Sequence, residues 1–420
     1  MNWIFIPLNI VVLFVLIRVL YRHSEALKKY VIPAVVLKLM AGLGIGLLYK
    51  YYYGAGDTLS FFHEAEQLAN LARNDVFGFV NYLFNSSELL HQTFYANQPR
   101  ALFLVKILSV VNLVTNSSYW LSCVYFSLFS FAGMWFLARV LSKIYPSKNG
   151  VIALALFFVP SAVFWSSGII KESIALGCLG FIAGVAMIII HDKKVSPTYL
   201  LLMLFNAIVL WQIKYYYAGV TFLILISMLA TMFITHKVGL VNKKKWAQMV
   251  LFAFFAFGMA GLVSILHPNF YPERFLNVVV ANNNEFVSIS NAGDYVDFEG
   301  LQSTWTSVIT HAPKALFSGL FRPFLGESAE PFKIITGIEN LALLLLTLYS
   351  FSQLPGKLNS RDFLLLISVI GFVIIMTVFL ALSAPNFGTL IRYKSGVIPF
   401  FVLIITFHNP YIIKLMGRLF

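Results

Sequence analysis

The chain has 420 residues, of which 59% are hydrophobic and 11% charged, with a mean hydropathy of +0.82. Soluble domains carry roughly 45–50% apolar and about 25% charged residues, so a soluble globular fold is excluded. Thirty Lys and Arg against 17 Asp and Glu give a net charge of +13. Because no cation-rich arm with interleaved aromatics is present, this excess indicates the cytoplasmic loops of a membrane protein and excludes a nucleic-acid partner.

The cysteines and the N-terminal stretch set further bounds. Cys123 and Cys178 both lie inside apolar runs, which does not fit a disulfide framework. The sequence has no clustered metal ligands, so no metal site is assigned and no cofactor is certain. Binding of a divalent cation is left open, although no clear ligand cluster supports it. The N-terminal apolar stretch has no small-residue cleavage site, so a retained helix is expected there.

Apolar runs in the sequence are long enough to cross a bilayer, which needs about 20 helical residues. Eleven runs qualify: 3–20, 31–53, 118–141, 149–165, 169–190, 197–213, 215–236, 246–266, 332–353, 361–383 and 394–408. The sequence therefore predicts an all-α, polytopic transmembrane bundle of these 11 spans. Residues 1–420 would form one transmembrane domain.

Positive charge gathers in every second loop, which predicts the orientation. These loops hold Arg22, Lys28 and Lys29; Arg139, Lys143 and Lys148; Lys193 and Lys194; Lys237, Lys243, Lys244 and Lys245; Lys357 and Arg361; and finally Lys414 and Arg418. Because cytoplasmic loops are enriched in Lys and Arg, we expect these loops inside the cell. The N-terminus is then outside and the C-terminus cytoplasmic.

Two long outer segments follow from this topology, 54–117 and 267–331. Within the first, residues 101–114 are apolar but too short to span, and crossing would break the alternation of loop charges. We expect this run to lie along the membrane surface. The chain shows no internal repeat, which weakens a transporter interpretation because many transporters consist of two similar halves.

A carboxylate follows the second span, in the stretch YYYGAGDTLSFFHEAEQLAN at 51–70. Asp57 follows Gly54 and Gly56, which allow a tight turn, and begins a helix whose apolar face is spaced at helical intervals. His63 and Glu64 lie largely off that face. This places a carboxylate at the membrane–water boundary, where it can act on a substrate. The alternative is that Asp57 only caps the helix.

Charged residues also lie at the outer ends of spans at two further positions. Pro160 and the SSG turn precede Lys171 and Glu172, which begin the next span. Ionisable residues at the edge of a span are costly and often functional, although a snorkelling lysine with a neighbouring carboxylate explains them equally well. Lys214, followed by three tyrosines between the sixth and seventh spans, fits an aromatic belt with one anchor.

Cations also occur late in the chain, on the predicted outer side. Arg322 lies on the amphipathic stretch 311–327, where cations facing lipid phosphates are the simpler explanation. Arg392 and Lys394 lead directly into the last span, against the inside bias of the other cations. An Arg–Lys pair binds phosphate well, so these residues favour a lipid-linked phosphate; snorkelling anchors are the alternative.

Together these segments resemble the GT-C superfamily of polytopic glycosyltransferases, and especially its bacterial members of surface oligosaccharide or exopolysaccharide assembly. The stretch GDTLSFFHEAEQLA is similar to the family's first outer loop, where a catalytic carboxylate follows a span. NQPRALFLVKILSVVNLV resembles its second surface helix, and RYK before Pro399 resembles a late element. Asp57 lacks the paired acid of many relatives, and the predicted outer N-terminus differs from theirs.

The resemblance implies a glycosyltransferase of the bacterial inner membrane. Its donor would be a sugar on a polyprenyl phosphate and its acceptor a glycan, lipid or protein. Asp57 would be the base, with Arg392 and Lys394 binding phosphate and Lys171 and Lys214 as weaker candidates for that work; the three main residues would share one outer cavity. Alternatives are a polymerase or ligase of lipid-linked glycans, a transporter or flippase, and a non-catalytic assembly subunit.

The topology can be tested by cysteine labelling from outside the cell. A cysteine introduced as Ala292→Cys should react with an impermeant maleimide, because residues 267–331 are expected outside. Asn242→Cys, in the lysine-rich loop, should react only after the membrane is opened. The reversed pattern would contradict the predicted orientation.

Overall fold

The structure, a computed structural model, describes residues 2–84, 94–95, 97–192, 195–237, 244–351 and 358–419. Across these ranges the regular elements are helices, with one isolated bridge between Tyr295 and Asn386. The chain divides into two units, Met1–Asn149 with Val163–Tyr215, and Gly150–Ala162 with Tyr216–Phe420. Four cations of the predicted basic loops lie outside the described residues: Lys193, Lys194, Lys243 and Lys357.

The first unit contains α1 (Asn2–Arg22), η1 (Glu25–Leu27), α2 (Lys28–Leu47), η2 (Leu48–Tyr52), α3 (Asp57–Asn74), α4 (Val76–Phe84), α5 (Pro99–Thr115), α6 (Tyr119–Ile144), η4 (Pro146–Lys148) and α9 (Lys171–His191). The second contains α12 (Lys245–Leu266), η5 (Pro268–Phe270), α13 (Pro272–Ser288), α14 (Trp305–Phe321), α15 (Pro331–Phe351), α16 (Ser360–Ser383), α17 (Phe387–Tyr393), η6 (Lys394–Gly396), α18 (Ile398–Phe407) and α19 (Pro410–Leu419). The unit boundaries fall in or beside α7 (Asn149–Phe157), α8 (Pro160–Phe164) and α10 (Pro197–Lys237).

Within the described ranges, eight helices are long and apolar enough to cross a membrane. They are Ile4–Arg22, Glu25–Tyr52, α6, α9, α10, α12, α15 and α16. A ninth candidate is a broken span, Phe387–Gly396 with Ile398–Phe407, bent by 63°. The chain is therefore the all-helical membrane protein that its composition predicts.

Three of the predicted spans have a different local structure. Residues 197–213 and 215–236 form the single 41-residue α10, but Lys214 has non-helical φ and ψ of −146° and 76°, so a break lies where the two runs were predicted to meet. The predicted span 149–165 is instead two short helices, α7 and α8. Pro160 explains this, because proline lacks an N–H and disfavours helix in the preceding residue. The nine residues of α7 rise only about 13 Å.

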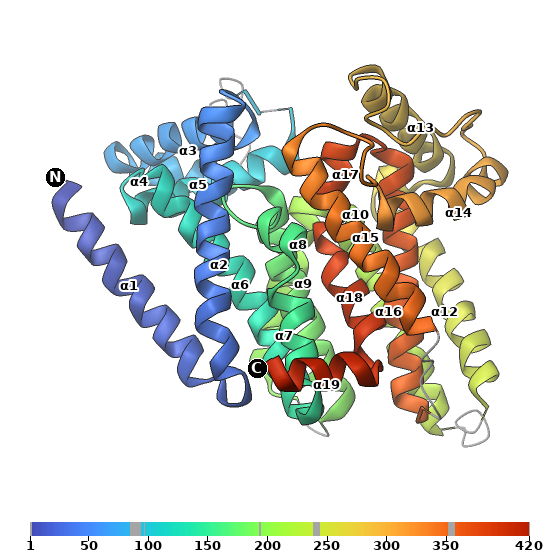
Figure 1. Ribbon diagram of the computed structural model, residues 1–420. Helices are drawn as coiled ribbons and strands as arrows, with labels where there is room; N and C mark the ends of the chain where they lie inside the picture. Colours follow the sequence, from blue (N-terminus) through green and yellow to red (C-terminus); the bar gives the residue numbers. More distant parts are fainter. Residues whose placement is uncertain are drawn as a thin grey trace. The chain divides into compact units, whose positions relative to one another are not determined.

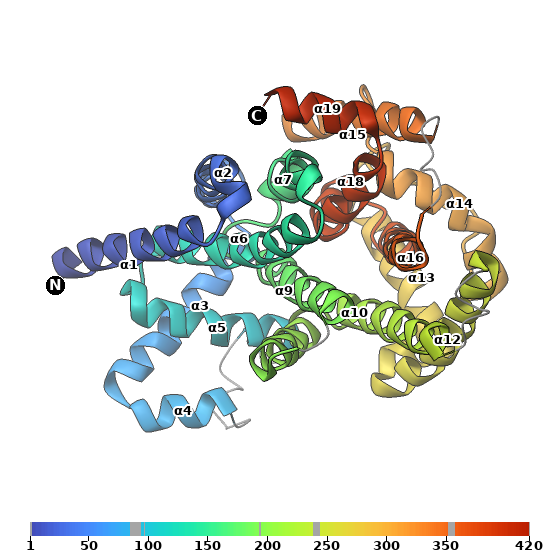
Figure 2. The ribbon, with the colours of Figure 1, turned by 90° about the horizontal axis from the view of Figure 1, so that it is seen from below.

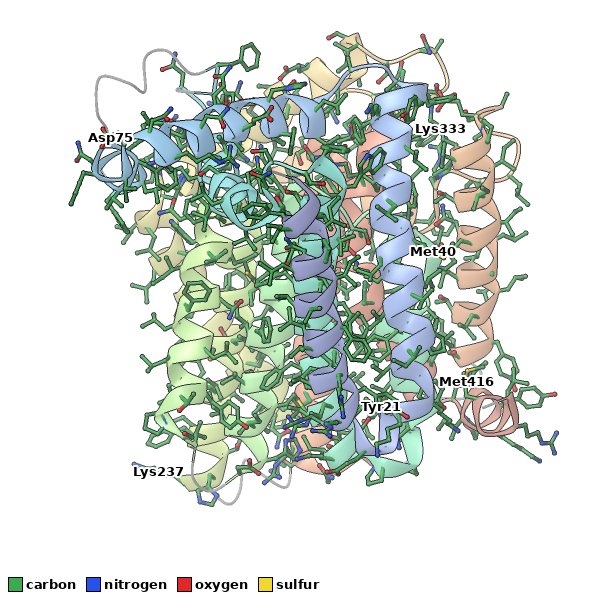
Figure 3. The ribbon with its side chains drawn as sticks, turned by 90° about the vertical axis from the view of Figure 1, so that its left-hand side faces the viewer. Tyr21, Met40, Asp75, Lys237, Lys333 and Met416 are labelled. Atoms are coloured by element: carbon green, nitrogen blue, oxygen red, sulfur yellow. The ribbon has the colours of Figure 1, made fainter. Side chains whose placement is uncertain are left out.

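In the first unit, three short helices lie across the long ones. Figure 1 and Figure 3 show α3, α4 and α5 running across the direction of α2 at one end of this unit. Asp75, after α3, lies at that end and Tyr21 at the other (Figure 3). The crosswise position of α5 is the one expected of a surface helix; its depth in the membrane stays a prediction. The buried face of α3 includes Phe61, Ala65 and Leu68, which matches the apolar spacing of the sequence.

Glycines bring α6 and α9 into close contact inside the first unit. A Cβ on Gly133 would lie 2.0 Å from the carbonyl oxygen of Gly177, and a Cβ on Gly180 would lie 2.3 Å from the carbonyl carbon of Gly133. Helices in membranes gain no hydrophobic drive from each other, so small residues that let backbones approach stabilise their packing. The α6–α9 contact is thus a central packing contact of this unit.

In the second unit, the helices α16 and α18 run along one direction and α19 lies across it. Figure 2 shows α16 and α18 nearly end-on and α19 on its side. Lys333, at the start of α15, lies at one end of this unit, and Lys237 and Met416 lie at the other (Figure 3). Gly319 of α14 packs against Thr377 of α16, where a Cβ would lie 2.5 Å from the threonine methyl group.

The close approach of α6 and α9 predicts a sharp response to one methyl group. Gly133→Ala should lower the free energy of unfolding by roughly 1–3 kcal/mol, because the new Cβ meets backbone that cannot move aside. Gly258→Ala in α12 is the matched control, since a Cβ there has no neighbour within 4 Å among the described residues. Thermal unfolding in detergent should show a lower Tm for the first variant and an unchanged or higher Tm for the second. Equal Tm values would contradict the packing argument.

Candidate functional site

Asp57 is the first residue of α3, and its side chain is exposed. The N-cap position belongs to Gly56, which makes no side-chain cap, so the expectation that Asp57 is the cap is wrong. Gly56 has φ of +132°, and a Cβ there would come within 2.7 Å of the Tyr49 ring. Only glycine suits that position. The carboxylate of Asp57 lies in the first turn, where the helix dipole favours negative charge.

Tyr95 packs against α3 beside Phe61 and Glu64. Its backbone N–H donates to Glu64 Oε1 at 3.2 Å, and its ring lies 4.9 Å from that of Phe61. Burial raises the pKa of the Tyr95 phenol, a hydrogen bond with Ser60 opposes this, and the charges of Asp57 and Glu64 raise it further. Burial also raises the pKa of the Glu64 carboxyl, against hydrogen bonds from backbone N–H groups. The Tyr95 phenol therefore stays neutral and lies near enough to Asp57 to feel its charge, while the Glu64 carboxyl lies about two turns farther along α3.

A cation joins this group from α9. The ammonium group of Lys171 lies 5.3 Å from the centre of the Phe61 ring. Phe61 is four residues after Asp57, so both project from one side of α3. The Asp57 cluster, defined as Asp57, Phe61, Glu64, Tyr95 and Lys171, thus holds a carboxylate one helical turn along α3 from the ring over which the Lys171 ammonium group lies.

The start of α9 is fixed by a buried lysine that the sequence reasoning missed. Lys38, inside the apolar helix α2, donates to Ser166 O at 2.7 Å, to Ser166 Oγ at 2.5 Å and to Val163 O at 3.3 Å. Gly168, with φ of +70°, then turns the chain toward Lys171. Lys38, in the middle of the run 31–53, is itself a signal, because ionisable residues within spans are rare and functional or paired.

Glu172 and Lys214 form a buried ion pair. Their side chains are only 3% and 4% exposed, and Lys214 Nζ donates to Glu172 Oε1 at 2.9 Å. The pair joins the start of α9 to the break in α10. Next to it, the Arg100 guanidinium at the start of α5 lies 5.3 Å from the centre of the Tyr215 ring. The predicted residues Lys171, Glu172 and Lys214 therefore all lie in the first unit with Asp57.

Lys394, predicted to bind phosphate, has a different set of partners in the second unit. Its ammonium group donates to Leu320 O at 3.3 Å, to Arg322 O at 3.1 Å and to Asn340 Oδ1 at 3.1 Å. The side chain is 2% exposed. Since an ammonium group has three N–H donors, none is left for a phosphate in this arrangement. Asn340 donates in turn to Pro323 O at 2.9 Å, so both residues hold the end of α14.

Arg322 and Arg392 are half-buried in the same unit. Arg322 Nε donates to both carboxylate oxygens of Glu327 at 2.9 and 3.1 Å, and its guanidinium lies 5.0 Å from the centre of the Phe387 ring. The ion pair with Glu327 thus occupies one edge of the Arg322 guanidinium group. Asp57 belongs to the first unit and Arg392 and Lys394 to the second, and their convergence on one cavity stays a prediction.

Two further expectations concern His63 and metal. His63 is exposed on α3, with its ring 6.2 Å from that of Phe62 and apart from the buried face that carries the cluster. Within the described ranges, no group of three or more His, Cys, Asp or Glu side chains is arranged to hold a metal ion. The Asp57 cluster itself supplies two carboxyl groups, a phenol and an ammonium group.

Comparison of the chain with models of protein families, with curated protein sequences and with solved structures gives no match. The family resemblance consequently rests on the motifs of this sequence alone. The function of the chain is therefore inferred from the geometry of the Asp57 cluster.

The buried ion pair predicts a strong asymmetry between single and double substitution. Lys214→Met should destabilise the protein by about 3–5 kcal/mol, because it leaves the Glu172 charge buried and unpaired. Glu172→Leu combined with Lys214→Met should recover most of that loss, since no charge then remains buried. Thermal unfolding of the three proteins in one detergent measures both steps. A double variant as unstable as Lys214→Met would show that the pairing is not the source of the effect.

Proposed function

We propose that this protein is a glycosyltransferase of the bacterial inner membrane that uses a polyprenyl-phosphate-linked sugar. The observation that carries the proposal is the Asp57 cluster. It combines an exposed carboxylate at a helix start with an ammonium group that lies over Phe61. Short helices lying across α2 form this end of the first unit, as a site serving a membrane-bound substrate requires.

The chemistry of sugar transfer needs these two groups. The acceptor hydroxyl attacks the anomeric carbon of the donor while the bond between that carbon and the phosphate oxygen breaks. Asp57 takes the hydroxyl proton as the reaction proceeds, and the electron pair of the broken bond leaves with the polyprenyl phosphate. Lys171 would stabilise the charge that grows on the departing phosphate. The leaving group is already an anion, so no acid is required to release it.

The Glu172–Lys214 pair supports the proposal indirectly. Because Glu172 is neutralised inside the protein, its negative charge does not oppose the binding of a phosphate near Lys171. Arg100, next to Tyr215, adds another cation at the same end of the unit. The likeness of GDTLSFFHEAEQLA to the first outer loop of GT-C enzymes agrees with a catalytic role for Asp57. Arg392 remains part of the proposal as a phosphate ligand, whereas Lys394 would act by holding the end of α14.

A transporter or flippase for lipid-linked glycans is the second candidate, favoured by the broken helices. Discontinuous spans commonly bind substrates in transporters. Here α10 breaks at Lys214, and α17 and α18 form a span bent by 63°. Both breaks have buried lysines bonded to protein groups, which argues for rigid breaks and against alternating access.

The proposal is tested with the purified protein in nanodiscs. Polyprenyl phosphates that each carry one radiolabelled hexose or pentose are offered with a mixture of membrane glycan acceptors, and release of polyprenyl phosphate is measured by chromatography. Asp57→Asn should lower the rate by about a hundred- to ten-thousand-fold, as expected for loss of a general base. Glu66→Gln, the same chemical change on the same helix, is the matched control and should keep the rate.

Each other result has a defined meaning. Full turnover in Asp57→Asn would contradict Asp57 as the base. Movement of a donor across the bilayer without release of polyprenyl phosphate would favour the transporter. A folded protein that turns over none of the donors would contradict the transferase proposal.

A further inference from the structure

The last helix, α19 (Pro410–Leu419), is held crosswise in its unit by hydrogen bonds at the turn that precedes it. Asn409 is 2% exposed, and its Oδ1 accepts from the backbone N–H groups of Tyr411 at 3.1 Å and Ile412 at 3.2 Å. Its Nδ2 donates to Ser350 Oγ on α15 at 3.1 Å. Figure 2 shows the result, with α19 lying on its side beside the end-on helix α18. The crosswise position is therefore fixed by hydrogen bonds.

The helix has two distinct sides. Met416 is buried, and Ile412 and Ile413 are half-buried against the unit. On the other side Tyr411 and Leu415 are 64% and 40% exposed. An apolar strip of α19 thus remains uncovered by the described residues. In an interfacial helix such a strip dips into the boundary between headgroups and acyl chains.

Two cations lie beside this uncovered strip. Lys414 and Arg418 are both exposed, and neither makes a hydrogen bond or ion pair with the part of the chain that the structure describes. They are four residues apart, a spacing at which like charges repel. The sequence has no Asp or Glu after Asp362, so no nearby acid on this segment relieves the repulsion. An external anion would relieve it.

Tyrosines mark the depth at which this anion would lie. The rings of Tyr349 and Tyr411 are 6.1 Å apart, and Tyr349 is 41% exposed at the end of the apolar helix α15. Tyrosine is enriched where acyl chains meet headgroups. At that depth Lys414 and Arg418, on the same helix as Tyr411, would be level with lipid phosphates.

We propose that α19 binds the headgroups of anionic phospholipids in the leaflet at its end of the second unit. The cations contact the lipid phosphates and any further negative charge on the headgroups. Tyr411 and Leu415 enter the boundary between headgroups and acyl chains. A free phosphate would satisfy only the cations, whereas a lipid surface fits the cations and the uncovered apolar strip together. This binding is independent of the proposed transferase activity.

The test places a fluorophore on α19 and asks which lipid surrounds it. Leu415→Cys is labelled with bimane and the protein is placed in nanodiscs of phosphatidylcholine and phosphatidylglycerol, with bromine on the acyl chains of one lipid or the other. The native Cys123 and Cys178 are fully buried and leave position 415 as the reactive one. At equal mole fractions, brominated phosphatidylglycerol should quench several-fold more, since each cation near an anionic surface strengthens binding about fivefold.

Two charge variants decide the cause. Lys414→Gln with Arg418→Gln should abolish the difference between the two lipids and keep quenching by both. Arg274→Gln with Lys314→Gln removes the same charge from α13 and α14 and should preserve the difference. Equal quenching in the parent, no quenching by either lipid, or a preference that survives Lys414→Gln with Arg418→Gln would each overturn the proposal.

Discussion

A helix that breaks inside a membrane exposes backbone carbonyls where no water can reach them, and the rest of this structure depends on how the breaks are closed. Three buried lysines lie at such breaks or at helix ends. Lys38 bonds to the carbonyls after α8, Lys394 to those after α14, and Lys214 lies at the break of α10 and pairs with Glu172. An ammonium group suits this work because it has three donors and can satisfy several carbonyls together.

These closures also decide what each lysine can do chemically. Lys38 fixes the turn through Gly168, and that turn sets where α9 begins. The start of α9 then brings Lys171 over Phe61, one turn of α3 from Asp57. Lys214 neutralises Glu172, so the carboxylate next in sequence to Lys171 is already paired. The buried lysines are therefore structural, and the cation that reaches the Asp57 cluster is the half-exposed one.

The two units place their charges differently along their own lengths. In the first unit the crosswise helices and the Asp57 cluster lie at the end opposite Tyr21, where the basic loops begin. In the second, Lys333 is paired with Asp294 and Glu330 at one end, at 3.0 and 2.9 Å, whereas Lys414 and Arg418 lie at the other. Paired cations stabilise protein loops, whereas Lys414 and Arg418, which have no partner among the described residues, remain for lipid.

The sequence alone determined that the chain is helical and membrane-embedded, because apolar length and the cost of an unpaired backbone leave few other folds. It also located the carboxylate Asp57, the break near Lys214 and the charged start of α9. The local pattern was interpreted incompletely at two positions. Pro160 and the following turn divide one apolar run, and Gly56, rather than Asp57, occupies the cap of α3. Sequence spacing likewise cannot show that the donors of Lys394 are spent on Leu320, Arg322 and Asn340, since these partners lie far away along the chain. Whether a cation bonds to groups inside the protein or binds an external ligand depends on its tertiary neighbours, and only the folded chain decides it.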